Sequence, residues 1–243
     1  MTTHAELGMN RTGIATSPKL TEEMLEGQKE FAPDAPGDER KISNTRSLTA
    51  QEWDTRIGSV PPPTTVKGAV KTGLTALKGE SPTQFIDRLG ARLAFERSGV
   101  RMYEALISKL DAGGSFKGGP TRADLETILN DEYEHFQLLV QALEHLGADP
   151  TVMTPSADLQ ATLSGGALQV LVEPRTDLAQ CLEAALTLEL IDNDSWAMLT
   201  TLASEAGQKE LALRFERALS EEAAHLTAVR RWIAAAQGVS LSG

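Results

Sequence analysis

The chain has 243 residues and a formal net charge of −11, which suits one large domain or one domain with an extension. Residues 1–80 hold 10 Lys and Arg against 11 Asp and Glu, so almost all of the negative charge belongs to residues 81–243, with 13 against 23. Such an acidic surface argues against nucleic acid and anionic membranes as partners, and it concentrates cations. The sequence shows no secretory signal, no apolar run near the ~18 residues of a membrane span, and a single cysteine, Cys181. We therefore expect a cytoplasmic, reduced protein.

Residues 1–80 form an N-terminal extension rich in Pro, Gly, Ser and Thr. Two short helices are predicted in it, one from near Thr21 and one from Thr49, where Thr49 and Glu52 match a capping box. The run at 61–63 is three prolines and should be extended, and residues 66–77 are weakly amphipathic. Two interpretations stay open, a poorly structured tail or an arm packed on the body or on a neighbouring subunit. We expect a homo-oligomer, with this arm as a candidate subunit contact.

Residues 81–243 change to a pattern of four long helices. Their predicted limits are Ser81 as N-cap to Gly113, Thr121 to Gly147, Thr176 to Gly207 and Gln208 to Gly238. Short links join the first to the second helix and the third to the fourth, so each pair should be an antiparallel hairpin. The nearly thirty residues between the hairpins are enough to cross the length of the helices. The sequence therefore predicts an all-α fold, an antiparallel four-helix bundle with one long crossover between its second and third helices.

Each predicted helix carries an apolar stripe that a glutamate interrupts near the middle. These residues are Glu96, Glu132, Glu189 and Glu222. Glu132 precedes His135 by three positions and Glu222 precedes His225 by three, a spacing that puts both side chains on one helix face. Because mid-helix residues of an antiparallel bundle meet at one level, all six side chains should converge in an apolar interior.

Four buried carboxylates repel one another and are costly to bury without partners. Two divalent cations would neutralise their four charges. A buried salt-bridge network is the alternative and would need basic residues. The stripes contain no Lys, and Arg92 is the only Arg one turn from a proposed ligand. The sequence thus favours a dinuclear metal site.

Two further residues have two interpretations each. Asp192, three positions after Glu189, either holds a histidine ring nitrogen or pairs with Arg92. Tyr103 is the candidate catalytic residue, through a hydrogen bond to a ligand carboxylate or through electron transfer; its alternative is a core tyrosine.

Residues 81–243 resemble the ferritin-like superfamily of dinuclear carboxylate proteins, which includes bacterioferritins, rubrerythrins and manganese catalases. The resemblance is carried by Glu96 with Tyr103 seven positions on, Glu132-x-x-His135, Glu189 and Glu222-x-x-His225. It implies that Glu132 and Glu222 bridge the two metals. It also implies that the terminal ligands are Glu96 with His135 on one metal, and Glu189 with His225 on the other.

We expect two iron ions and the oxidation of iron, or related redox chemistry, with O₂ or peroxide, because carboxylates are hard anionic ligands that stabilise Fe(III). Tyr133 stands where a bacterioferritin has its haem-ligating methionine, so no haem is expected. One cysteine cannot build the electron-transfer domain of a rubrerythrin. Three alternatives stay open: a dimanganese catalase-like activity, an oxygenase activity, and a non-enzymatic bundle whose metal, such as zinc, is structural.

Overall fold

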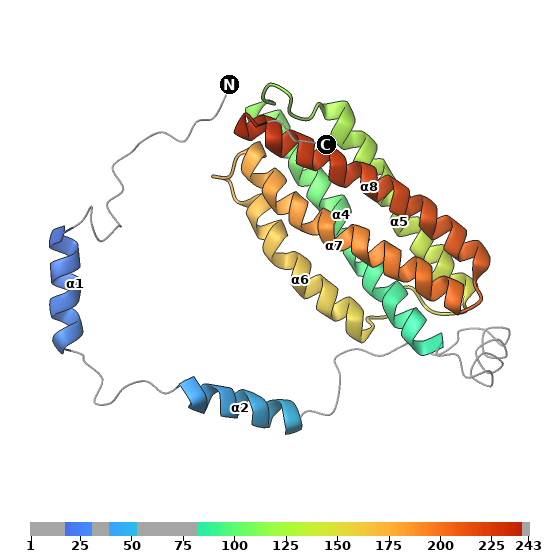
Figure 1. Ribbon diagram of the computed structural model, residues 1–243, viewed down its shortest axis with the longest axis horizontal. Helices are drawn as coiled ribbons and strands as arrows, with labels where there is room; N and C mark the ends of the chain where they lie inside the picture. Colours follow the sequence, from blue (N-terminus) through green and yellow to red (C-terminus); the bar gives the residue numbers. More distant parts are fainter. Residues whose placement is uncertain (1–17, 31–38, 53–81, 240–243) are drawn as a thin grey trace. The chain divides into compact units, whose positions relative to one another are not determined.

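The structure is a computed structural model that describes residues 18–30, 39–52 and 82–239. All regular secondary structure in these ranges is helical: α1 (Pro18–Glu30), α2 (Glu39–Glu52), α4 (Pro82–Gly113), α5 (Arg122–His145), α6 (Pro155–Val172), α7 (Leu178–Glu205) and α8 (Lys209–Gln237). The all-α fold class is therefore confirmed (Figure 1). Among the described helices, none combines the length and the apolar character that a membrane span requires.

Helices α1 and α2 belong to one compact unit and α4–α8 to another. Helix α1 contains Thr21, near the predicted start of the first short helix. The predicted start of the second short helix at Thr49 is wrong, because α2 begins at Glu39 and Thr49 lies in its last turn. There the Thr49 hydroxyl donates to the carbonyl of Thr45 at 2.9 Å, so it is bonded backwards along the helix and does not cap a new one. The proline run, residues 66–77 and Ser81 lie outside the described residues.

The four predicted long helices correspond to α4, α5, α7 and α8, with ends within about two residues of those expected. Thr121 caps α5 through a reciprocal pair of bonds with Asp124, and Asp177 caps α7 in the same way with Gln180. Gly207 follows α7 with a φ of 69°, a left-handed conformation that costs glycine little. Local capping chemistry thus sets where α5 and α7 begin and where α7 ends.

Helix α6 lies in the segment that was predicted only as a crossover. Thr154 caps it by accepting from the backbone N–H of Ala157, and Pro155 occupies its first turn. Its first turn is bonded to α4, because the carboxylate of Asp87 accepts from the backbone N–H of Ser156 at 2.9 Å and from its hydroxyl at 2.6 Å. The connection between α5 and α7 is therefore itself helical and attached to α4.

The packing of α4–α8 follows from which helices touch. Helix α4 contacts α5, α6 and α7, while α8 contacts α7 and α5. Helices α4, α5, α8 and α7 therefore make a closed ring of contacts, and α6 packs against α4 and α7 outside that ring (Figure 1).

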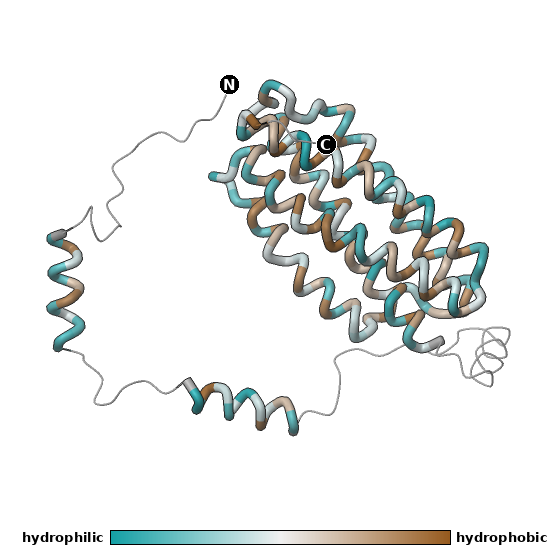
Figure 2. The backbone as a smooth tube through the Cα atoms, in the orientation of Figure 1, coloured by the Kyte–Doolittle hydropathy of each residue, from teal (hydrophilic) through white to brown (hydrophobic). Residues whose placement is uncertain are grey.

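The core of α4–α8 divides into two apolar clusters along the helices. One contains Leu89, Leu139 and Phe215, and the other contains Leu125 and Val229. Hydrophobic positions accordingly recur along the length of each helix (Figure 2). Along α5, α7 and α8, the residues between the two clusters include buried acids and histidines. The apolar clusters thus enclose a polar layer in the middle of the helices.

Candidate metal centre

The six side chains predicted as metal ligands meet in this polar layer. They are Glu96 on α4, Glu132 and His135 on α5, Glu189 on α7, and Glu222 and His225 on α8. All six are buried, with at most 4% of each residue exposed. The structure therefore brings together every residue of the predicted ligand set, from four different helices.

Among the described residues, the potential ligand atoms fall into three overlapping groups that share Glu222. In one group, one ligand atom from each of Glu132, Glu189, Glu222 and His225 lies within 4.8 Å of all the others. The same holds in the second group for Glu96, His135 and Glu222, and in the third for Glu96, Glu132, Asp192 and Glu222. Glu222 faces both histidines, because its Oε1 lies 2.7 Å from Nδ1 of His135 and its Oε2 lies 3.2 Å from Nδ1 of His225. Two adjacent sites with one common carboxylate are the arrangement that a dinuclear centre needs.

Buried ligand atoms without hydrogen-bond partners are concentrated in this cluster. Within the described residues they are Oε2 of Glu96, both carboxylate oxygens of Glu132, Nδ1 of His135, Oε2 of Glu189 and Oε1 of Glu222. Nδ1 of His135 and Oε1 of Glu222 lie 2.7 Å apart and attract each other as an ion pair when the histidine is protonated. Buried polar atoms are normally bonded, and leaving one unbonded costs about 1–3 kcal/mol. The donor set of oxygens and imidazole nitrogens fits iron, manganese or zinc.

Each of the two histidines in the cluster has a carboxylate at Nε2, the ring nitrogen that faces away from Glu222. The sequence did not predict either carboxylate. Nε2 of His135 lies 2.9 Å from Oε2 of Glu221, and Nε2 of His225 lies 3.0 Å from Oδ2 of Asp131. The contacts are reciprocal between α5 and α8, since Asp131 precedes Glu132 and Glu221 precedes Glu222. An Nε2–H bonded to a carboxylate leaves Nδ1 with a lone pair directed into the cluster. The signal in the sequence was an acidic residue directly before the glutamate of both Glu-x-x-His motifs.

Asp192 pairs with Arg92, which is one of the two interpretations that the sequence left open. Nη2 of Arg92 donates to Oδ1 of Asp192 and to Oε1 of Glu96. The guanidinium carbon also lies 4.6 Å from the ring centre of Phe95. An Arg-centred network of this kind accounts for Asp192 and one oxygen of Glu96. It provides nothing for Glu132, whose two oxygens make no hydrogen bond among the described residues and whose Oε1 lies 4.0 Å from Nδ1 of His225.

Tyr103 is fully buried and donates a hydrogen bond from its hydroxyl to Oε1 of Glu189. Burial raises the pKa of Tyr103 well above its ordinary value, and the negative charge of Glu189 raises it further. The phenol therefore stays a neutral donor that orients Glu189. Its predicted contact with a ligand carboxylate is present.

Several groups of the metal-free cluster have pKa values far from their ordinary ones. Burial, followed by repulsion from Glu222, raises the pKa of Glu132 well above its ordinary value and that of Glu189 to about 8. Burial would also raise the pKa of Glu222, but its contacts with the two histidines bring it down to about 2. Burial lowers the pKa of both histidines, yet their contacts with Glu222 lift each to about 9. In the metal-free cluster, bound protons thus offset the negative charge of the carboxylates, as bound cations would.

Comparison with known protein families, with curated proteins and with solved structures finds no match for this chain.

Proposed function

We propose that residues 82–239 form a ferritin-like four-helix bundle that binds two divalent metal ions in its polar layer. The observation that carries the proposal is the set of buried, unpartnered ligand atoms on residues that converge from four helices. The closed ring of α4, α5, α8 and α7 supports the bundle, and the long connection that contains α6 supports the crossover. Two cations would satisfy these atoms and balance the four carboxylate charges.

The two groups that contain a histidine suggest how the ions would share the residues. Glu222 belongs to both groups and therefore suits a bridging position. One ion would take Glu96 and His135 as its own ligands, and the other would take Glu189 and His225. Glu132 lies with the second pair, and an oxygen of it also lies within 4.8 Å of a ligand atom of Glu96, which supports it as the second bridge.

We further propose iron as the metal and O₂ or peroxide as the oxidant. Two bound Fe(II) ions would supply the electrons that reduce the oxidant. The chain supplies hard anionic carboxylates, which favour Fe(III), and two imidazoles that complete a mixed ligand set. Tyr103 and Arg92 hold Glu189 and Glu96 in place through the bonds described above.

Protons displaced by metal binding could reach solvent through Asp131 and Glu221. The side chains of Asp131 and Glu221 are 31% and 42% exposed, and each contacts Nε2 of a buried histidine. A proton held on either histidine therefore lies one hydrogen bond from a carboxylate that reaches solvent.

The experiment that tests the metal site is an anaerobic Fe(II) titration of the full chain. Wild-type protein should bind about two ions per chain, and Glu132→Ala and His225→Ala should each bind fewer. Glu134→Ala is the matched control, because Glu134 lies within the same motif and is exposed. Unchanged stoichiometry in both ligand variants excludes this cluster as the site.

The reaction is tested separately by oxidant consumption. The Fe(II)-loaded chain should consume O₂ or peroxide with oxidation of the bound iron. Peroxide breakdown by the Mn(II) form alone identifies a catalase-like activity instead. Two ions bound with no consumption of either oxidant in any metal form identifies a structural metal site.

A further inference from the structure

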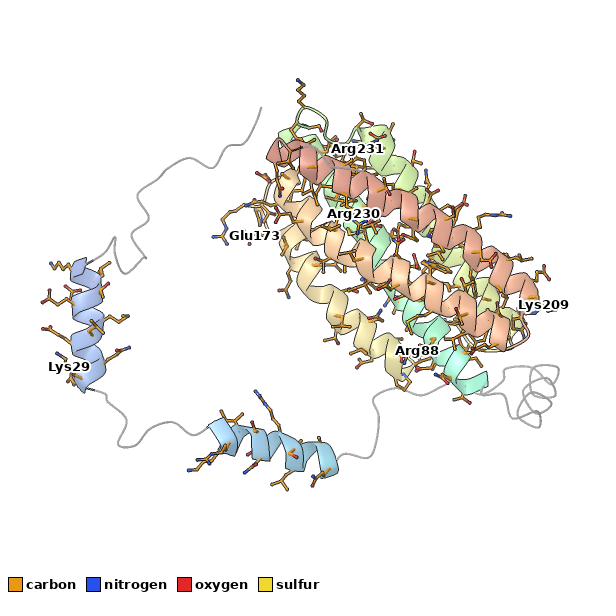
Figure 3. All side chains as sticks on the ribbon, viewed as in Figure 1. Lys29, Arg88, Glu173, Lys209, Arg230 and Arg231 are labelled. Carbon is orange, nitrogen blue, oxygen red and sulfur yellow. The ribbon has the colours of Figure 1, made fainter. Side chains whose placement is uncertain are left out.

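Helix α6 carries apolar residues on all its sides, although it lies outside the ring of α4, α5, α8 and α7. Its 18 residues include one charged residue, Asp158. Figure 3 shows the helix between the labelled Arg88, near its first turn, and the labelled Glu173, which directly follows its last residue. A helix that is apolar all round is normally covered all round. Four large apolar side chains of α6 are nevertheless exposed, more than in any other described helix: Leu159, Leu163, Val170 and Val172.

Three of these side chains form a stripe with a gap in it. Leu159, Leu163, Gly166 and Val170 follow one another at intervals of four, three and four residues, which places them on one face of the helix. All four positions are exposed. Met198 on α7 is 63% exposed and lines the same pocket as Leu159. The exposed apolar surface therefore runs along α6 and continues onto α7.

The glycines in the middle of α6 are not required by packing within the described residues. A Cβ atom at Gly165 or Gly166 would meet no atom within 4 Å, whereas a Cβ at Gly90 or Gly99 of α4 would overlap a neighbouring side chain. Glycine weakens the interior of a helix relative to alanine, so a glycine at an open position is unfavourable for α6 by itself. The gap at Gly166 becomes favourable when the side chain of another helix fills it.

We propose that the α6 face joins two copies of this chain in an antiparallel pair with twofold symmetry. The midpoint of the stripe lies between Leu163 and Gly166. A twofold axis at this point places Leu163 of each copy over Gly166 of the other copy, and Leu159 against Val170. The stripe is thus complementary to itself. This proposal does not depend on the metal site, so either proposal can fail alone.

Charge supports a second copy as the occupant of this face. Residues 81–243 hold 13 Lys and Arg against 23 Asp and Glu, so two copies repel each other over most of their surface. A basic partner would be attracted to the acidic residues of the other helices instead. The single charge on α6 belongs to Asp158, which lies one position before Leu159 and therefore outside the stripe. The α6 face is accordingly where two acidic copies can meet without bringing like charges together.

The size of the face predicts a weak pair. The 18 residues of α6 span about 27 Å, and a helix with its side chains is about 10 Å wide. Two such faces, each with Met198 beside it, bury on the order of 1,000 Å² in total, which is near the lower limit for a specific interface. We therefore expect a reversible dimer with a dissociation constant on the order of 10–100 μM.

The test is sedimentation equilibrium of the full chain at concentrations from about 5 to 500 μM. Wild type should show a monomer–dimer equilibrium. Leu163→Glu should raise the dissociation constant at least about tenfold, because it brings two like charges together at the axis. Leu213→Glu is the matched control, because Leu213 is a similarly exposed leucine on α8, and it should leave the dissociation constant unchanged. Gly166→Leu should also weaken the dimer, because it fills the gap, although it makes the face more apolar.

A mixture of two variants tests the symmetry. Leu163→Lys should weaken the dimer by itself, as Leu163→Glu does. An equimolar mixture of the two should form heterodimers, because each residue 163 lies beside residue 163 of the other copy and the charges are now opposite. A mixture that associates no better than either variant alone overturns the twofold pairing. Monomers at every concentration, or an assembly that Leu163→Glu and Leu213→Glu both leave unchanged, overturn the α6 interface.

Discussion

Gly99 on α4 faces the carboxylate of Glu132 so closely that a Cβ atom at position 99 would overlap Oε2 of Glu132. A glycine inside a helix costs about 1 kcal/mol relative to alanine. Here the missing side chain provides the space into which α5 projects a buried carboxylate. Gly99 lies one helical turn from Glu96, so α4 contributes to the cluster through a ligand and through a gap.

Replacing Gly99 by alanine should therefore displace Glu132. We expect Gly99→Ala to weaken binding of the second metal ion at least about tenfold, or to abolish it. Gly165→Ala is the control, because no atom lies within 4 Å of a Cβ at that position of α6. It should raise the free energy of unfolding by about 0.5–1 kcal/mol and leave metal binding unchanged. Two ions bound by Gly99→Ala with wild-type affinity would remove Glu132 from the ligand set.

The stability of the metal-free protein should fall between about pH 5 and pH 9. Glu189 has a pKa raised to about 8, and His135 and His225 have values near 9. A group whose folded-state pKa is raised stabilises the fold below its unfolded-state value, and this contribution is lost as the pH rises through the folded-state value. Mn(II) replaces these protons, so the rise in Tm that it causes should grow over the same range.

Calorimetric melts at pH 5 and pH 8, with and without Mn(II), measure this effect. Glu189→Gln should lessen the loss of metal-free stability at pH 8, because it removes a buried group that must ionise there. Glu183→Gln changes an exposed residue of the same helix and should alter nothing. An Mn(II) effect that is equal at both pH values would mean that metal and protons do not compete for one cluster.

Much of the fold and of the cluster was predictable because both rest on local spacing. The long helices show a period of 3.6 residues. Capping residues mark their limits, as Thr121 does at the start of α5 and Gly207 after the end of α7. The ligands stood out because each interrupts an apolar stripe, as Glu132 does between Ile128 and Leu139. A polar residue at a core position is informative without any knowledge of its partners.

Helix α6 was missed because it lacks a polar face. Leu159 and Leu163 are more than half exposed while Leu171 is buried, so apolar residues occur on both its inner and outer sides. No period of 3.6 residues then appears in the sequence. The cap of Thr154 followed by Pro155 was the remaining signal.

The roles of Asp131, Glu221 and Gly99 depend on how neighbouring helices are placed against each other. Each of the two acids lies one helical turn before a histidine of its own helix and is partly exposed, yet the histidine that it contacts belongs to the neighbouring helix. Each meets a histidine only because α5 and α8 lie at one particular register. The same applies to Asp192. The sequence left two partners open for it, a histidine ring nitrogen and Arg92, and the placement of α4 against α7 decides for Arg92.

The carboxylates on the outer histidine nitrogens should tune metal affinity without being ligands. Asp131→Asn and Glu221→Gln should each weaken metal binding about 10- to 100-fold, because a neutral amide accepts more weakly from Nε2–H and can instead donate to Nε2, which would put the proton on Nδ1. At saturating metal, both variants should still bind two ions. Equilibrium dialysis against Zn(II) at several concentrations separates affinity from stoichiometry. Glu134→Gln serves as the control, and equal affinity in all three variants would show that these contacts do not orient the histidines.

Tyr103 and Tyr133 are the two tyrosines of the chain, and they permit a matched comparison. Tyr103 is fully buried and bonds Glu189, whereas Tyr133 is 46% exposed. Tyr103→Phe keeps the packing volume but leaves Oε1 of Glu189 without its donor. The metal-free variant should therefore lose about 0.5–1.5 kcal/mol of unfolding free energy, the net worth of one buried hydrogen bond. Tyr133→Phe should lose much less.

The same pair of variants tests whether Tyr103 acts in the reaction. With metal bound, Tyr103→Phe should still take up two ions, because the phenol is not in the ligand set. If Tyr103 acts in the reaction, stopped-flow mixing of the Fe(II) form with O₂ should show an altered rate of iron oxidation, because Glu189 loses the hydrogen bond that orients it. Tyr133→Phe should oxidise iron at the wild-type rate. Equal oxidation rates in both variants, alongside the stability loss at Tyr103, would restrict this tyrosine to holding Glu189 in the folded protein.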